Sequence, residues 1–205
     1  MKRLIPLAAA AAMCITGGSA QAANVALGAD VSVSGAGFGN SGWWGGGSSA
    51  GASTITDGVY VTASQEWNNG TVYWSGAVPD PSDVITISLP GAARVTSITM
   101  QADNNDDYRI LFKDTNSVWH DLAVLQPLRS WGMQLGSVNF TEVIATAFQI
   151  QAVGGDGLYS VSEFEVIGER LIGGNQVPEP ASLGLAALGL GLLLRRPARS
   201  IKPRV

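Results

Sequence analysis

Residues 84–89 read Val84-Ile85-Thr86-Ile87-Ser88-Leu89, and this strict alternation places Ile85, Ile87 and Leu89 on one face of an extended chain. Successive side chains of a strand point to opposite faces of a sheet, so the pattern predicts a half-buried β-strand. Pro90-Gly91 follows at once and is expected to end the strand, because proline offers no N–H to a neighbouring strand.

Similar alternation recurs on both sides of this stretch, and no part of residues 24–176 sustains a helical apolar period beyond two turns. The further expected strands are residues 25–34, 95–100, 108–112, 147–151 and 162–166. Polar turns separate them, as at Asp103-Asn104-Asn105-Asp106. Short strands at this spacing predict an all-β fold, an antiparallel jelly-roll β-sandwich. About 150 residues suffice to bury a core unaided.

Residues 35–51 interrupt this regularity, because eight of the seventeen are glycine. We expect a long loop there, carrying Trp43 and Trp44. An exposed indole has an apolar face that can stack on a sugar ring or enter an interface. The alternative is that the pair folds back as a plug over the end of the sandwich. Trp67 and Trp131 are further candidates for the rim of such a binding surface.

Three other residues are weighed in the same way. Trp74 and Trp119 stand in strand-like sequence, so we expect both in the core. Arg109 is one of few basic residues in the central region and is a candidate for binding a ligand hydroxyl or carboxylate. Pairing of Arg109 with a neighbouring aspartate in the sheet is the alternative that the sequence favours.

Charge and composition exclude several classes of function. Residues 24–176 hold five basic and fifteen acidic residues, a net charge of −10, which argues against nucleic-acid binding. Cys14 is the only cysteine and His120 the only histidine, so a disulfide framework, a Cys/His zinc site and a Cys–His dyad are excluded. Neighbouring His120 and Asp121 would point to opposite faces of a strand and cannot act as a base and its orienting acid. We expect no enzyme.

The N-terminus has the three parts of a secretory signal peptide. Lys2 and Arg3 precede an apolar run from Leu4 to Ile15, and Ala20-Gln21-Ala22 offers small residues to signal peptidase. Cleavage is expected after Ala22, which would remove Cys14. The run is too short for a spanning helix.

The C-terminus combines Pro178-Glu179-Pro180, an apolar run from Leu183 to Leu194 and a cluster of arginines. This arrangement resembles the PEP-CTERM sorting signal of Gram-negative bacteria. The resemblance implies that an exosortase removes a short transmembrane helix, so that the membrane is touched only transiently, and that the protein accompanies exopolysaccharide production. A plain C-terminal anchor is the alternative. The predicted divisions are residues 1–22, signal peptide; 23–170, sandwich; 171–176, linker; and 177–205, sorting signal.

An ordered series of short segments carries a second resemblance. The segments are Asn24 to Gly28, Ala52 to Gly58, Tyr73-Trp74-Ser75, Asp107 to Ile110, Val118-Trp119 and Ser162 to Gly168. The series resembles the discoidin, or coagulation-factor type C, modules of the galactose-binding-like superfamily. This implies a jelly-roll sandwich that binds sugars, lipids or proteins through loops at one end. The better-known members join their ends by a disulfide, which this chain lacks, so strand pairing is expected to close the domain.

The same resemblance implies a calcium site. Some sugar-binding members hold a structural Ca²⁺ with side chains that correspond here to Asp57 and Glu163, and with carbonyls near Thr54, Val59 and Ser162. Ca²⁺ prefers six to eight hard oxygen ligands, and backbone carbonyls can supply half. The alternative is that Asp57-Gly58 is only a turn and Glu163 an exposed strand residue. The Asp103–Asp107 cluster lacks the Gly and distal Glu of a calcium loop and is interpreted as a turn.

These observations predict an exported, non-catalytic module that binds extracellular polysaccharide at the cell surface or in the extracellular matrix. The first alternative is a structural matrix protein without a sugar site, which acts by self-association or protein contacts. The second is a small polysaccharide-acting enzyme with two carboxylates, because such pairs need not be close in sequence.

Overall fold

The computed structural model describes residues 22–76 and 79–171, so the predicted sorting signal and nearly all of the predicted signal peptide lie outside the described residues. The elements are β1 (Ala23–Asn24), β2 (Asp30–Ser34), β3 (Ser48–Ser49), a 3-10 helix η1 (Ala52–Thr56), β4 (Asn69–Ser75), β5 (Val84–Asp103), β6 (Asp107–Lys113), β7 (Trp119–Leu125), β8 (Met133–Gly154) and β9 (Leu158–Arg170). No helix among the described residues has the length and apolar character needed to cross a membrane.

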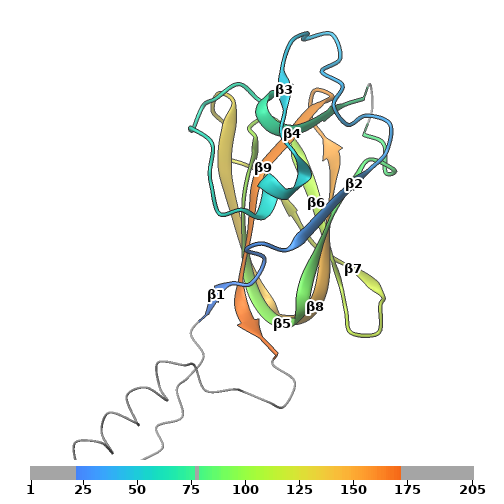
Figure 1. Ribbon diagram of the computed structural model, residues 1–205, viewed down its shortest axis with the longest axis vertical. Helices are drawn as coiled ribbons and strands as arrows, with labels where there is room; N and C mark the ends of the chain where they lie inside the picture. Colours follow the sequence, from blue (N-terminus) through green and yellow to red (C-terminus); the bar gives the residue numbers. More distant parts are fainter. Residues whose placement is uncertain (1–21, 77–78, 172–205) are drawn as a thin grey trace, which may run out of the picture. The chain divides into compact units, whose positions relative to one another are not determined.

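Two long strands, β5 and β8, organise the sheet (Figure 1). The sequence predicts an end at Pro90-Gly91 and a separate strand at 95–100, and both predictions are wrong. A single strand of 20 residues runs through the proline, and its register against β8 is interrupted between Ser88 and Ala93. Proline is tolerated there because the bend removes it from the ladder, so its missing N–H costs no hydrogen bond.

The bends in β5 and β8 fold one continuous nine-stranded sheet into two layers. The first half of β5 pairs with β2 and with the second half of β8, which is followed by β6 and β7. The second half of β5 pairs with β9, which leads to β4 and β3. The predicted all-β sandwich is confirmed, with one departure from antiparallel pairing at the short β3–β4 contact.

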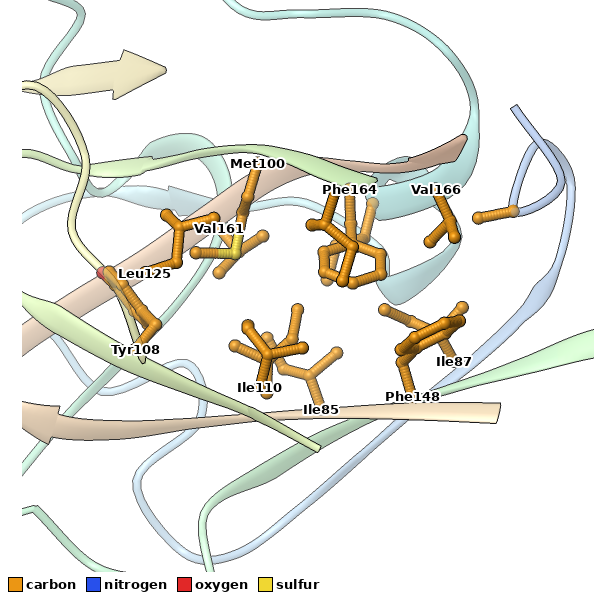
Figure 2. Close-up of a cluster of buried hydrophobic side chains, with 14 of the residues drawn as sticks. Ile85, Ile87, Met100, Tyr108, Ile110, Leu125, Phe148, Val161, Phe164 and Val166 are labelled. Carbon is orange, nitrogen blue, oxygen red and sulfur yellow. The ribbon is translucent and has the colours of Figure 1, made fainter. Parts of the chain in front are cut away.

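The core lies between the two layers. Figure 2 shows Met100, Val161 and Phe164 pointing from one layer toward Ile110 and Phe148 of the other. The alternation of residues 84–89 places Ile85, Ile87 and Leu89 on one face of the strand. Ile85 and Ile87 are fully buried, and Leu89 is partly buried against the core. Trp74 is buried, as the sequence predicts. The prediction for Trp119 is wrong: it is half-buried on β7, where the Lys113 ammonium lies 5.7 Å from its ring.

The domain closes without a disulfide, by pairing β1 with β9. The expected strand over 25–34 is broken, because the chain turns at Gly28, where φ is +68°, before β2 begins at Asp30. Asn24 stabilises this closure, since its Oδ1 accepts hydrogen bonds from the backbone N–H groups of Ala26 and Val166 at 3.0 and 3.1 Å. Hydrogen bonding thus replaces the covalent link.

Candidate functional site

A pocket opens where the loops between several strands meet. Its volume is about 80 Å³, and three indoles line it together with four polar residues: Trp44, Trp67, Trp131, Asp103, Asn104, Asn105 and Asp156. These residues come from five separate segments of the chain and so meet only in the fold. We call this site the tryptophan pocket. The segment between β2 and β4, which carries Trp44, crosses this end of the sandwich at the top of Figure 1.

The indoles form a continuous exposed row. Trp43 contacts Trp44 edge-on at 5.4 Å between ring centroids, and Trp44 lies 6.4 Å from Trp131. The exposed fractions of Trp43, Trp44 and Trp131 are 75%, 38% and 60%, so the glycine loop presents its tryptophans outward and does not plug the core. Trp44 Nε1 donates a hydrogen bond of 2.6 Å to Glu66 Oε1, which fixes the orientation of the central ring.

Trp67 departs from its predicted place on the rim. Its side chain is only 5% exposed and packs edge-on against Tyr73 at 5.4 Å, in a small cluster with Met133 and Leu158. The indole therefore forms part of the buried wall of the tryptophan pocket. Its Nε1 is buried and has no hydrogen-bond partner among the described residues.

The acidic residues beside the pocket repel one another. Asp103 and Asp106 are 5% and 1% exposed. Burial, and then the charge of Asp156, raise the pKa of Asp103 to about 6, while burial and the charges of Asp103 and Asp156 raise the pKa of Asp106 to about 8. Asp106 holds the loop of Asp156 by accepting its backbone N–H at 3.3 Å. Asp156 accepts from Asn105 Nδ2 and from the backbone N–H of Leu158, each at 2.9 Å. The loops are therefore tied together through carboxylates.

A second pocket adjoins the first. Its volume is about 270 Å³, and Trp43, Asn40 and Gly42 line it with Asp156 and Leu158, which also line the tryptophan pocket. We call it the neighbouring pocket. Because two residues are common to both walls, one extended ligand can occupy the two pockets in sequence.

The predicted calcium side chains lie together. Glu163 is fully buried, its Oε2 accepts the backbone N–H of Gly58 at 3.2 Å, and its Oε1 has no partner among the described residues. Burial first, and then the nearby charge of Asp57, raise the pKa of Glu163 to about 7. Asp57 Oδ1 accepts the backbone N–H of Val59 at 2.8 Å. Glu163 is therefore not the exposed strand residue of the alternative interpretation.

The other members of the predicted calcium set lie on either side of this pair. Thr54 belongs to η1, where its hydroxyl bonds to the Gly51 carbonyl, and Ser162 precedes Glu163 on β9, where its hydroxyl bonds to Gln101. The described residues contain no group of three or more His, Cys, Asp or Glu side chains that could hold a metal ion. A site here would depend on two carboxylates and backbone carbonyls.

The remaining candidates are occupied elsewhere. Arg109 forms a two-pronged ion pair with Asp121 across β6 and β7, so the structure has the aspartate pairing that the sequence favours, and Arg109 lines neither pocket. His120 Nε2 lies 3.0 Å from Asp114 Oδ2. His120 and Asp121 thus have different partners and do not contact each other as a base and its orienting acid would.

Comparison with known proteins adds to this geometry. Residues 176–199 match the model of the PEP-CTERM protein-sorting motif. The chain carries a PEP-CTERM sorting motif. A motif of this kind indicates export and processing at the C-terminus. No curated protein matches the chain.

Solved structures resemble the sandwich of this chain. A family 32 carbohydrate-binding module of C. perfringens NanJ, solved with galactose, is 19% identical with a TM-score of 0.50, over 72% of this chain and 98% of the module. The lectin domain of lectinolysin, solved with the Lewis B antigen, is 14% identical with a TM-score of 0.48, over 70% and 95%. A fucose-binding module of Streptococcus pneumoniae is 16% identical with a TM-score of 0.47, over 72% and 96%. At these identities, the first likeness supports the fold alone.

The sequence analysis did not predict the polar part of the tryptophan pocket. Asp103 and Asn105 stand in the cluster interpreted as a turn, and Asp156 stands between glycines about fifty residues later. Their residue types suit both a turn and a binding site. Hydrogen bonds from Asn105 and to Asp106 bring Asp156 to this cluster, and local sequence carries no signal for those contacts.

Proposed function

We propose that this chain is an exported, non-catalytic carbohydrate-binding module that binds extracellular polysaccharide through its loop end, at the cell surface or in the extracellular matrix. The observation that carries the proposal is the exposed row of Trp43, Trp44 and Trp131 beside two adjoining pockets. Sugar rings have apolar C–H faces that stack on indoles, and polar groups around the rings fix orientation and specificity.

Export and processing give the module its place of action. We infer that signal peptidase cleaves after Ala22 and that an exosortase recognises Pro178-Glu179-Pro180 within the matched motif. The apolar helix behind the motif would then leave the protein, and the sandwich would remain outside the inner membrane of a Gram-negative cell. A binding module delivered in this way meets the polysaccharide that the cell secretes.

A structural Ca²⁺ fits the pair of Asp57 and Glu163. A fully buried carboxylate with one unpartnered oxygen is costly unless a cation neutralises it, and Glu163 Oε1 is such an atom. The two carboxylates, with carbonyls of Thr54, Val59 and Ser162, would supply the hard oxygens that Ca²⁺ prefers. Bound there, the ion would tie the η1 turn to β9 and supply structural rigidity, with no part in chemistry.

Retention on polysaccharide from the producing strain tests the proposed function. The double change Trp43→Ala with Trp44→Ala should weaken retention about 5- to 150-fold, because two stacking faces are lost at a cost of about 1–3 kcal/mol. The melting temperature should stay nearly constant, since both indoles are exposed. Trp119→Ala removes an indole from β7 outside both pockets and serves as the matched control. A wild-type protein that binds no polysaccharide would favour the structural matrix protein instead.

A further inference from the structure

The tryptophan pocket gathers negative charge that no basic side chain answers. Asp103 and Asp156 line the pocket, and Asp106 lies close to both of them. Glu66 accepts the hydrogen bond of Trp44 at the edge of the pocket. No Lys or Arg among the described residues lines this pocket or the neighbouring one. Arg129, on the loop that carries Trp131, pairs with Asp107 at 3.5 Å instead. The carboxyl groups of the pocket therefore have no cationic side chain in its lining to balance their charge.

Polar atoms in its walls are also left without partners. Trp67 Nε1 and Asn105 Oδ1 are buried and form no hydrogen bond. Asp103, at 5% exposure, accepts the backbone N–H of Asn104 through Oδ1 at 2.9 Å, and no described residue donates to its Oδ2. The Asn105 amide is oriented by its donation to Asp156, which leaves Oδ1 as the free acceptor. The atoms without a partner are thus one buried donor, one buried acceptor and the accessible Oδ2 of the Asp103 carboxyl group.

These unmet groups define the ligand that completes the pocket. A buried donor or acceptor without a partner costs about 1–3 kcal/mol, so a ligand that supplies the partners gains that much. A metal ion would leave the Trp67 N–H unpaired, and the described residues hold no group of three metal-ligating side chains. A volume of about 80 Å³ admits the substituents of a ring, while the ring itself can rest on the exposed indoles. An ammonium group beside a hydroxyl satisfies every unmet atom.

We propose that the tryptophan pocket binds a protonated amino sugar, a hexosamine unit of a polysaccharide that bears no N-acetyl group. The ammonium donates to Asp103 Oδ2. Asn105 Oδ1 and the Trp67 N–H lie just beneath the pocket surface, and a small opening of the wall on binding brings them within reach of the ammonium and of an adjacent hydroxyl. The ring lies against Trp44 and Trp131, whose faces attract a cation. An acetyl group would remove the charge and two of the three donors. This assignment rests on the proposed function and names the class of sugar that the same site selects.

Calorimetric titration of the exported protein with three trisaccharides of the same linkage tests the assignment. The ligands are the trimers of glucosamine, N-acetylglucosamine and glucose, at pH 6.5, where Asp103, whose pKa is raised by burial to about 6, is mostly ionised. Hydrogen bonds to charged groups exceed neutral ones by about a factor of two in energy, so the glucosamine trimer should bind about tenfold more tightly than either neutral trimer. Equal affinities, or tighter binding of a neutral trimer, would overturn the amino-sugar assignment and leave the proposed function standing. No binding of any trimer or of the native polysaccharide would overturn both.

Variants separate the pocket from the general acidity of the surface, because a net charge of −10 attracts any cationic sugar. Asp103→Asn keeps the Oδ1 acceptor for Asn104 and should abolish the preference for the amine while affinity for the neutral trimers stays constant. Glu142→Gln removes the same charge at the bend of β8, beside a cleft that shares no residue with the tryptophan pocket, and should keep the preference.

A preference that survives in Asp103→Asn would show that general charge attraction is its source and would overturn the assignment. If Asp103→Asn fails to fold, Asn105→Ala removes the second acceptor from a half-buried position and should lower the preference several-fold. An unchanged preference in Asn105→Ala would count equally against the pocket.

Discussion

Asp106 illustrates how a single buried residue sets the behaviour of the loop end. Its Oδ2 lies 3.2 Å from the Tyr108 hydroxyl, which is also 3.0 Å from the Ser160 carbonyl. One hydroxyl proton cannot serve both oxygens. A protonated Asp106 resolves the conflict, because it donates to Tyr108 while Tyr108 donates to Ser160. This arrangement agrees with the pKa of Asp106, which burial raises to about 8.

The contact between Asp106 and Tyr108 predicts that the free energy of unfolding depends on pH. The pKa of Asp106 is higher in the folded state than in the unfolded chain, so its contribution is present at low pH and is lost as the pH rises from about 4 through about 8. Asp106→Asn mimics the neutral acid, since its Nδ2 can donate to Tyr108. It should be near neutral at pH 4 and stabilising at pH 9 by an amount of the order of 2 kcal/mol. Urea denaturation at both pH values measures the difference.

A control of opposite sign is available in Asp114. Hydrogen bonds from the Val118 backbone and from His120 lower the pKa of Asp114, so Asp114→Asn should destabilise the protein at neutral pH and have less effect at pH 3. If Asp106→Asn destabilises the protein equally at every pH, Asp106 is ionised in the fold and the assignment of its proton is wrong.

Glu163 leads to a prediction about calcium. If Asp57 and Glu163 hold Ca²⁺, chelation should lower the melting temperature by about 5–10 °C, because an ion at 100 times its Kd stabilises the native state by about 2.7 kcal/mol. Asp57→Ala should melt near the chelated wild type and ignore further chelator, as differential scanning calorimetry would show. A wild-type melting curve that is indifferent to both chelator and added Ca²⁺ would remove the site.

At the scale of the elements, the glycine-rich segment owes its position to contacts that its own sequence does not contain. Asn68 is 2% exposed, and its Nδ2 donates to the carbonyls of Gly45 and Gly46 at 3.3 Å. Gly47 has φ of +110°, and a Cβ there would lie 2.8 Å from the Asn68 carbonyl, so only glycine fits so close to it. This clamp holds the segment that carries the exposed indoles.

The clamp predicts that affinity depends on a residue outside the pockets. Asn68→Ala removes the hydrogen bonds that hold residues 43–47. Because binding would then have to order this segment at a cost in conformational entropy, affinity for polysaccharide should fall about 3- to 10-fold. Hydrogen exchange of residues 43–47 should accelerate in the variant. Asn116→Ala, in the exposed turn between β6 and β7, is the matched control and should change neither quantity. Reduced affinity without faster exchange would point to a cause other than the clamp.

The elements also show what the sequence can and cannot predict. Alternation identified the buried face of Val84–Leu89, because burial on one side of a strand is a local property. It failed at Pro90-Gly91, since a proline that ends one strand and a proline at the bend of a longer one leave the same local signal. Trp67, expected at the rim, is buried, and Trp119, expected in the core, is half-buried. The burial of an indole depends on which residues the rest of the fold places against it, and the local sequence does not show them. The asparagine and aspartates of the pocket required the closed fold.

At the scale of the whole module, the two adjoining pockets predict a dependence on ligand length. A monosaccharide with its substituents in the tryptophan pocket leaves the neighbouring pocket empty, whereas a longer chain can pass Asp156 and reach Trp43. Affinity should therefore rise about tenfold from one sugar unit to three or four, the gain of one further stacking contact. Trp43→Ala should remove that gain and leave monosaccharide binding constant, as titration with ligands of increasing length would measure. Equal loss at every length would mean that Trp43 serves the first pocket instead.

Strand β9 begins at Leu158, which lines both pockets, and ends at Arg170, just before the segment that leads to the sorting motif. Its 13 residues span roughly 40 Å, at about 3.3 Å per residue. Tension between a held polymer and a fixed C-terminus would therefore run along this strand. Its ladders to β4 and β5 would be loaded in shear, many bonds at once, so the module would resist pulling far better than a hairpin peeled open one bond at a time.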